Sequence, residues 1–235
     1  MAAALGLVKN NSPFLEQRLL PRHSFEYLLF KLDFPAATLA VVDISPQGMQ
    51  LRKRGDLSFS VGQAVQGKLA WDGSFLSITG EISWANEEGC GVRFKLDSAQ
   101  EKQFKDFFAP KSVAAHLRLV KSNDENNLAN LKCWLHAGKA AEILVWQHPG
   151  GQVAKIQVIY LGNLVEWEDG QGLRTGQITS VRPSDTPLQL QETLAVAVDK
   201  KCQDKKLQLA KELVQHLPSD LLPGEVQDFI TLKLR

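Results

Sequence analysis

Two arginines, Arg18 and Arg22, stand four residues apart near the start of this 235-residue chain. The planar guanidinium fork of arginine donates two parallel hydrogen bonds, which match the O6 and N7 acceptors of a guanine edge or two phosphate oxygens. Lysine would supply charge without that geometry. Pro21 disfavours helical backbone at Leu20, so we expect an extended or turning arm that can fold over a ligand. The pair therefore predicts contact with a ligand that carries guanine, phosphate or both.

A second polar motif, with the pattern D-x-S-x-x-G, spans residues 43–48. The carboxylate of Asp43 can accept hydrogen bonds from guanine N1–H and the N2 amine, or hold one of the arginines. The Ser45 hydroxyl can donate to a phosphate or accept from a base. Gly48 suits a turn that needs positive φ, or a backbone that a ligand approaches closely. Apolar residues flank the motif on both sides, which predicts a strand–turn–strand junction.

Taken together, R-x-x-x-R and D-x-S-x-x-G resemble the ligand-binding signature of the PilZ family. Later segments resemble this family as well. A strand at 80–84 ends in a tryptophan, and a G-V-x-F strand follows at 91–94. A capping-box pattern at 98–101 then opens a helix, as expected for a barrel closed by a C-terminal helix. The resemblance covers about residues 12–109.

PilZ proteins are known as receptors for the bacterial second messenger cyclic di-GMP, a dianion with two guanine bases. The resemblance implies that this chain is a cytoplasmic signalling protein that binds this nucleotide and needs no further cofactor. Ligand binding would order the arm and change how the domains or a partner are arranged. The binding residues that the resemblance implies are Arg18, Arg22, Asp43, Ser45 and Gly48.

Two other classes of function stay open. A PilZ-like scaffold would bind proteins and no nucleotide, but such members typically lack the arginine motif that is present here. An enzyme with its site in the second half of the chain is the third class. The sequence has no G-x-S-x-G, no phosphate-binding glycine loop with lysine and no H-E-x-x-H, so we do not expect catalysis.

The composition is that of a soluble globular protein, with 44% hydrophobic and 23% charged residues. A net charge of +1 produces no global field to attract long nucleic acids. No apolar segment approaches the length of a membrane span, so we do not expect membrane insertion. The three cysteines, Cys90, Cys133 and Cys202, are odd in number and widely spaced, which argues against a disulfide framework and for the cytoplasm.

The predicted fold is mainly β with C-terminal helices. An irregular arm at 1–17 precedes a PilZ-like, six-stranded antiparallel β-barrel with a closing helix at 18–110. The helix is expected at 98–108. The barrel strands are expected at 24–32, 38–44, 48–53, 63–71, 75–84 and 90–96.

Residues 111–235 predict a second β-rich domain that resembles no family. A long helix is expected to begin with Thr186 and Pro187 and to run to Leu217, with a short terminal helix from Pro223. The pattern leaves open whether residues 199–206 interrupt the long helix. One hypothesis is that this output domain binds a protein partner, or a second copy in a homodimer, through the apolar stripe of the 187–217 helix. The alternative is that the stripe faces its own core. The second-domain strands are expected at 130–136, 141–148, 153–161, 163–168 and 173–181.

A metal site is not expected from Cys133, His136 and His148. The first two lie three apart on a predicted strand and would point to opposite faces, and a closed zinc site needs four ligands. The five tryptophans are expected in the core rather than on a base-stacking platform; Trp84, nearest the proposed site, is expected to pack. A solvated helix face is expected for the lysine cluster Lys200, Lys201, Lys205 and Lys206.

Overall fold

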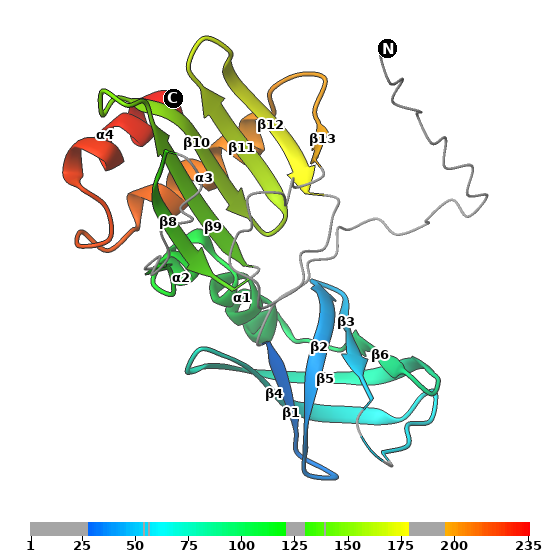
Figure 1. Cartoon of the computed structure of the whole chain (residues 1–235). Coiled ribbons are helices and arrows are strands. Elements are labelled where there is room, and N and C mark those ends of the chain that lie inside the picture. The colour runs from blue at the N-terminus through cyan, green and yellow to red at the C-terminus, as the bar shows by residue number, and fades with distance from the viewer. Residues whose placement is uncertain (1–27, 54, 56, 121–129, 139, 179–195) are drawn as a thin grey trace.

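The computed structural model describes residues 28–53, 55, 57–120, 130–138, 140–178 and 196–235, and in these residues the chain forms two β units (Figure 1). Six strands close into a barrel in the order β1-β2-β3-β6-β5-β4, and seven others form an open sheet. The predicted fold class is thereby confirmed. Among the described residues, no helix combines the length and the apolar character that crossing a bilayer requires.

The barrel is antiparallel throughout, because each of its neighbouring strands runs opposite to the next. Residues alternate between the interior and solvent along most of the strands, and Phe30, Leu69 and Ile78 are completely buried inside. The strands are β1 (Leu29–Leu32), β2 (Ala37–Ser45), β3 (Gly48–Arg52), β4 (Ala64–Trp71), β5 (Ser74–Ala85) and β6 (Gly89–Phe94).

Two helices follow the barrel, α1 (Ser98–Phe107) and α2 (Pro110–Ala114). A capping box begins α1, one residue before the predicted position. Asp97 accepts a hydrogen bond from the Gln100 backbone at 2.8 Å, and the Gln100 side chain accepts one from the Asp97 backbone at 3.1 Å. Aspartate takes the N-cap position, so Ser98 becomes the first helical residue. Phe104 and Phe108 then pack against the barrel core.

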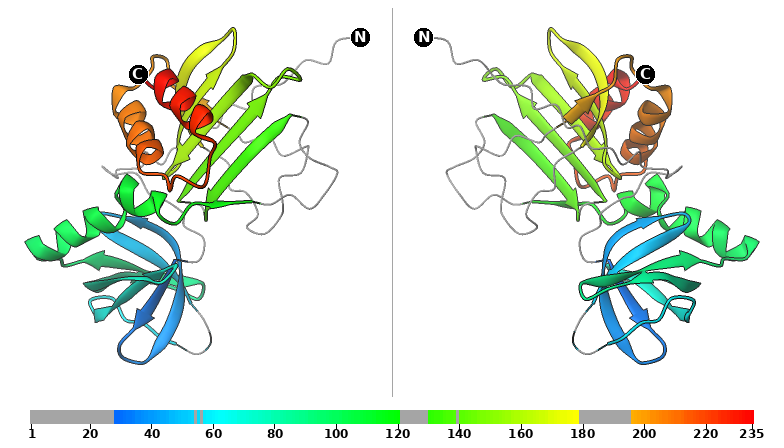
Figure 2. Two further views of the ribbon diagram at one scale, coloured as in Figure 1. Left: turned by 90° about the vertical axis from the view of Figure 1, so that its left-hand side faces the viewer. Right: turned by 90° about the vertical axis from the view of Figure 1, so that its right-hand side faces the viewer.

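The second unit is a meandering antiparallel sheet in the order β13-β12-β11-β10-β9-β8-β7. Figure 2 shows α3 and α4 on one face of this sheet, and α1 and α2 between the sheet and the barrel. The two edge strands were not predicted because they are only two and three residues long. The strands are β7 (Arg118–Leu119), β8 (Leu131–Ala137), β9 (Ala141–Gln147), β10 (Val153–Tyr160), β11 (Asn163–Glu168), β12 (Gly172–Ile178) and β13 (Val196–Val198).

The expectation of one long helix to Leu217 is wrong at its centre. Val196–Val198 is the strand β13, which pairs with β12, and helix α3 starts only at Asp204 and ends at Gln215. Hydrogen bonding to the edge of β12 overrides the helical spacing of the apolar residues, and the Val-Ala-Val sequence suits a strand. The expected helix start at Thr186 and Pro187 lies outside the described residues.

The apolar stripe of α3 faces its own domain. Ala210, Leu213 and Val214 are buried, and α3 packs on β10, β11 and α4 (Gly224–Lys233). Of the two alternatives, contact with a partner and contact with its own core, the structure shows the second for the α3 part of the stripe. Lys206 is also not a solvated residue. Its ammonium group bonds the Gly176 carbonyl at 2.9 Å and Asp199 at 2.8 Å, which joins α3 to β12 and to the end of β13.

Replacing Gly67 by alanine should destabilise the barrel. A Cβ atom there would lie 2.3 Å from the Lys31 carbonyl oxygen and 2.7 Å from the Phe30 ring. We expect Gly67→Ala to lower the free energy of unfolding by about 1–3 kcal/mol, as overpacking does. Denaturant unfolding followed by circular dichroism measures this, with the exposed Ser77→Ala on the adjacent strand as the control. Equal stabilities for the two variants would contradict the close approach of β1 and β4.

Candidate functional site

The D-x-S-x-x-G motif forms the hairpin between β2 and β3 at one end of the barrel. Ser45 and Gly48 face each other across a two-residue turn of Pro46 and Gln47. The Ser45 hydroxyl donates to the Gly48 carbonyl at 3.2 Å and accepts from the Gln47 backbone N–H at 3.4 Å. This serine is only 9% exposed, so its first effect is to shape the turn.

Gly48 is required by the packing of two strands. A Cβ atom at this position would lie 2.3 Å from the Val92 carbonyl oxygen of β6. The turn is tied to β6 a second time, because the Phe94 N–H donates to the Gln47 carbonyl at 2.9 Å. Gly48 is not among the residues with positive φ, so the first role expected for this glycine is not found, and the close approach in the structure is to β6 rather than to a ligand.

Asp43 lies on the outer surface of the barrel in a row that crosses four strands. It pairs with Gln50 on β3, Gln50 pairs with Gly91 on β6, and Gly91 pairs with Trp84 on β5. Paired residues project from the same face of a sheet, and the neighbouring Ile44 points into the core. Trp84 packs over Gly91, where a Cβ atom would lie 2.1 Å from the indole nitrogen. The row runs around half of the closed barrel, so Asp43 and Trp84 both lie on the outside of the barrel but on opposite sides of it.

Arg18 and Arg22 lie outside the described residues, but the strand they precede has a defined direction. The Val41 N–H donates to the Leu28 carbonyl at 3.0 Å, and β1 runs antiparallel to β2. Leu28 therefore lies beside Val41, and β2 continues from there to Asp43 and Ser45.

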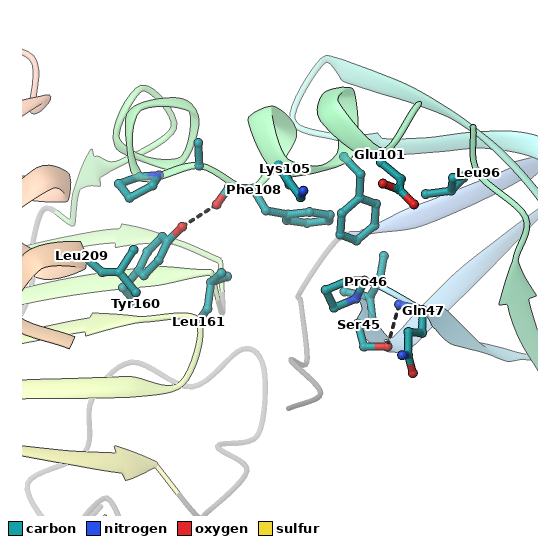
Figure 3. Close-up of a pocket in the computed structure, with 14 residues that line it drawn as sticks. Ser45, Pro46, Gln47, Leu96, Glu101, Lys105, Phe108, Tyr160, Leu161 and Leu209 are labelled. Atoms are coloured by element: carbon teal, nitrogen blue, oxygen red, sulfur yellow. Dashed lines mark hydrogen bonds between the residues drawn. The ribbon is translucent and has the colours of Figure 1, made fainter. Parts of the chain in front are cut away.

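A pocket of about 550 Å³ opens beside this turn, between the barrel and the second domain (Figure 3). One wall is the turn itself, residues 44–47, and a second wall is α1 with the start of α2. The third wall belongs to the second domain, where Tyr160 and Leu161 at the β10–β11 turn and Leu209 of α3 face the first two walls. Of the predicted site residues that the structure describes, Ser45 lines this pocket and Asp43 and Gly48 do not, and the sequence gave no indication of the third wall.

The two domains are joined by hydrogen bonds and ring contacts near this pocket. The buried Tyr160 hydroxyl donates to the Phe108 carbonyl at the end of α1, and burial, with the nearby Glu212 carboxylate, raises the pKa of the Tyr160 hydroxyl. On β4, the Trp71 ring stacks against His116 with 4.4 Å between ring centroids, and His116 also contacts the Ser74 hydroxyl. The end of α1 is therefore held by the second sheet.

The discounted metal ligands do not converge. Cys133 is buried toward the core, whereas His136 lies on the other face of β8, beside Trp134 and 3.6 Å from the Glu142 carboxylate. Within the described ranges, no cluster of histidine, cysteine, aspartate or glutamate side chains has the arrangement of a metal site. Cys90, Cys133 and Cys202 are all free thiols.

Comparison with known proteins identifies the family of the barrel domain. The family model of the PilZ domain matches residues 25–109, so this part of the chain is a PilZ domain and the predicted family resemblance is confirmed there. Among solved structures, the crystal structure of the Borreliella burgdorferi PlzA protein in complex with c-di-GMP aligns over 88% of this chain and 86% of that chain, at 12% identity and a TM-score of 0.23. No curated protein matches the chain.

Replacing Tyr160 by phenylalanine tests the tie between the domains. Losing the hydroxyl should lower the free energy of unfolding by about 0.5–1.5 kcal/mol at neutral pH. The unfolded tyrosine loses its proton near pH 10, whereas the folded one, with its raised pKa, keeps it. Wild-type stability should therefore fall more steeply above pH 10 than that of Tyr160→Phe. Unfolding curves from pH 7 to 11 measure both slopes, and parallel slopes would contradict the burial of this hydroxyl.

Proposed function

We propose that this protein is a receptor for cyclic di-GMP, and that Arg18, Arg22, Asp43, Ser45 and Gly48 form its binding site. The observation that carries the proposal is that Leu28, the first residue described after the two arginines, pairs with Val41, two residues before Asp43 on the strand that leads into the D-x-S-x-x-G turn. The PilZ domain at residues 25–109 supports it, since receptors for this messenger are known in that family.

Each part of the site has a chemical task in this proposal. The arginine forks grip guanine edges and phosphate oxygens, which lysines could not do in a bidentate manner. Asp43, on the outer surface beside the turn, accepts from the donor edge of a guanine. Ser45 and Gly48 hold the turn in the shape that presents these groups.

The response to the messenger would pass to the second domain. Ordering of the arm at the turn changes the surroundings of the pocket, whose opposite wall carries Tyr160 and Leu161. A shift of this wall relative to α1 would alter the surface that the second domain presents to a protein partner or a second copy. In this proposal the protein is a signal receptor without catalytic activity, and it works in the cytoplasm.

Isothermal titration calorimetry of the full chain with cyclic di-GMP tests the assignment. We expect saturable binding, and Arg18→Ala and Arg22→Ala should each weaken it by about 10-fold to 150-fold, because each removes charge-assisted hydrogen bonds of about 1.5–3 kcal/mol. The exposed Arg235→Ala is the matched control and should bind like the wild type. Higher salt should weaken wild-type binding, because the ligand is a dianion.

Two outcomes would count against this proposal in different ways. Unchanged binding in both arginine variants, with circular dichroism showing intact folds, would exclude the arm from the site. Absence of binding by the wild type would favour the PilZ-like scaffold that binds proteins and no nucleotide.

A further inference from the structure

The pocket between the two domains shares a wall with the proposed messenger site. Ser45, Pro46 and Gln47 line it, so a ligand held at the turn lies at its mouth. Its volume of about 550 Å³ falls within the range of small-molecule sites, about 300–1,000 Å³. The pocket is therefore large enough to take one purine base of a ligand whose phosphates stay at the turn.

The walls of the pocket suit a flat aromatic base. Pro46 lies on one side, Phe108 at the end of α1 lies on another, and Leu161 of the second domain lies opposite. Phe104 of α1 also lines the pocket. Flat faces of this kind bind planar rings through dispersion and exclusion of water. Apolar walls alone do not distinguish guanine from adenine, so selectivity must come from the polar groups.

Two charged residues supply those polar groups. Glu101 and Lys105 stand four apart on α1, and both line the pocket on the helix side that faces Pro46 and Gln47 (Figure 3). A carboxylate can accept from both the N1–H and the N2 amine of guanine, whereas adenine offers an acceptor at N1. The ammonium group of Lys105 suits the guanine O6 or a phosphate oxygen. This pair therefore matches the charge pattern of a guanine nucleotide.

Leu161 carries an independent sign of function, because its backbone lies in the left-handed region. Leu161 and Gly162 have φ of 48° and 76° and form the two-residue turn between β10 and β11. Asp72 and Gly73 form the corresponding turn between β4 and β5 with φ of 41° and 83°. The first position of that turn holds aspartate, which is one of the residue types that two-residue turns with positive φ favour. Leucine is disfavoured at such a position, and strain of this kind concentrates at ligand sites. The conformation of the turn gives no reason for a leucine at this position. The side chain of Leu161 lines the pocket, and this contact is a reason for it.

We infer that this pocket is a guanine subsite of the messenger site, in which Glu101 reads the base edge, Lys105 balances the ligand charge and Leu161 of the second domain closes over the ring. The inference rests on the proposed binding of cyclic di-GMP. It gives the second domain direct contact with the ligand, so that occupancy and domain position are coupled.

Calorimetric titration of charge variants with cyclic di-GMP is the first test. Glu101→Gln and Lys105→Met should each weaken binding by about 10-fold or more, because each removes a hydrogen bond to a charged group. Lys102→Met and Asp106→Asn are matched controls, since both residues are exposed on α1 and do not line the pocket. The controls should bind within about 2-fold of the wild type. Equal losses in controls and pocket variants would overturn the subsite.

Base selectivity separates recognition by Glu101 from a structural role in α1. The wild type should prefer cyclic di-GMP to cyclic di-AMP, and Glu101→Gln should reduce that preference by about 10-fold, because its amide presents both a donor and an acceptor. A general weakening of α1 would lower both affinities together and leave their ratio unchanged. An unchanged ratio would therefore overturn base reading by Glu101.

Leu161→Asn is the variant that keeps the fold intact. Asparagine is favoured in this turn, so the thermal midpoint should stay equal or rise, while affinity for cyclic di-GMP should fall by about 5-fold or more as the apolar wall is lost. If Glu101, Lys105 and Leu161 variants all bind like the wild type while Arg22→Ala does not bind, the subsite is wrong and the receptor function stands. If the wild type itself does not bind, both proposals fail.

Discussion

The fit of the β2–β3 turn against β6 is the constraint on which the candidate site depends. Gly48 has no room for a side chain because the Val92 carbonyl lies where a Cβ atom would be, and the Gln47 carbonyl accepts the Phe94 N–H from the same strand. With the turn fixed at both points, the direction of β2 is fixed too. Asp43 then lies on the outer surface and Ser45 at the barrel end. The D-x-S-x-x-G pattern is therefore a folding signal, whatever it binds.

The second constraint is the tie between α1 and the second sheet. Tyr160 is buried and donates to the Phe108 carbonyl, so the end of α1 cannot move without breaking a hydrogen bond in a region that water does not reach. α1 is also the helix that carries Glu101 and Lys105 into the pocket. A ligand that contacts this helix thus acts on an element that both domains hold, which is a physical route from the barrel to the second sheet.

Local patterns account for what could be predicted. Barrel strands such as β4 alternate inside and outside, and that alternation can be read directly from the residues. The helix α1 was predicted from its capping pattern, although the cap is Asp97 rather than Ser98. Strand β13 was missed because it is only three residues long and lies within a run of apolar residues at helical spacing. Nothing in the local sequence shows that strand β12 will pair with it. Lys206 was expected in solvent for the same reason, since its partners Gly176 and Asp199 are brought near only by folding.

The sequence by itself determined the PilZ barrel, the strand–turn–strand setting of Asp43 and Ser45, and the chemistry that two arginine forks can perform, because these depend on residue type and short-range spacing. Only the tertiary structure decided that the turn faces a second domain across a pocket, and that Leu161 enters this pocket from a left-handed turn. Those features arise from contacts between segments that are more than a hundred residues apart in the chain. Such contacts depend on how whole sheets and helices pack, and no local pattern specifies that packing.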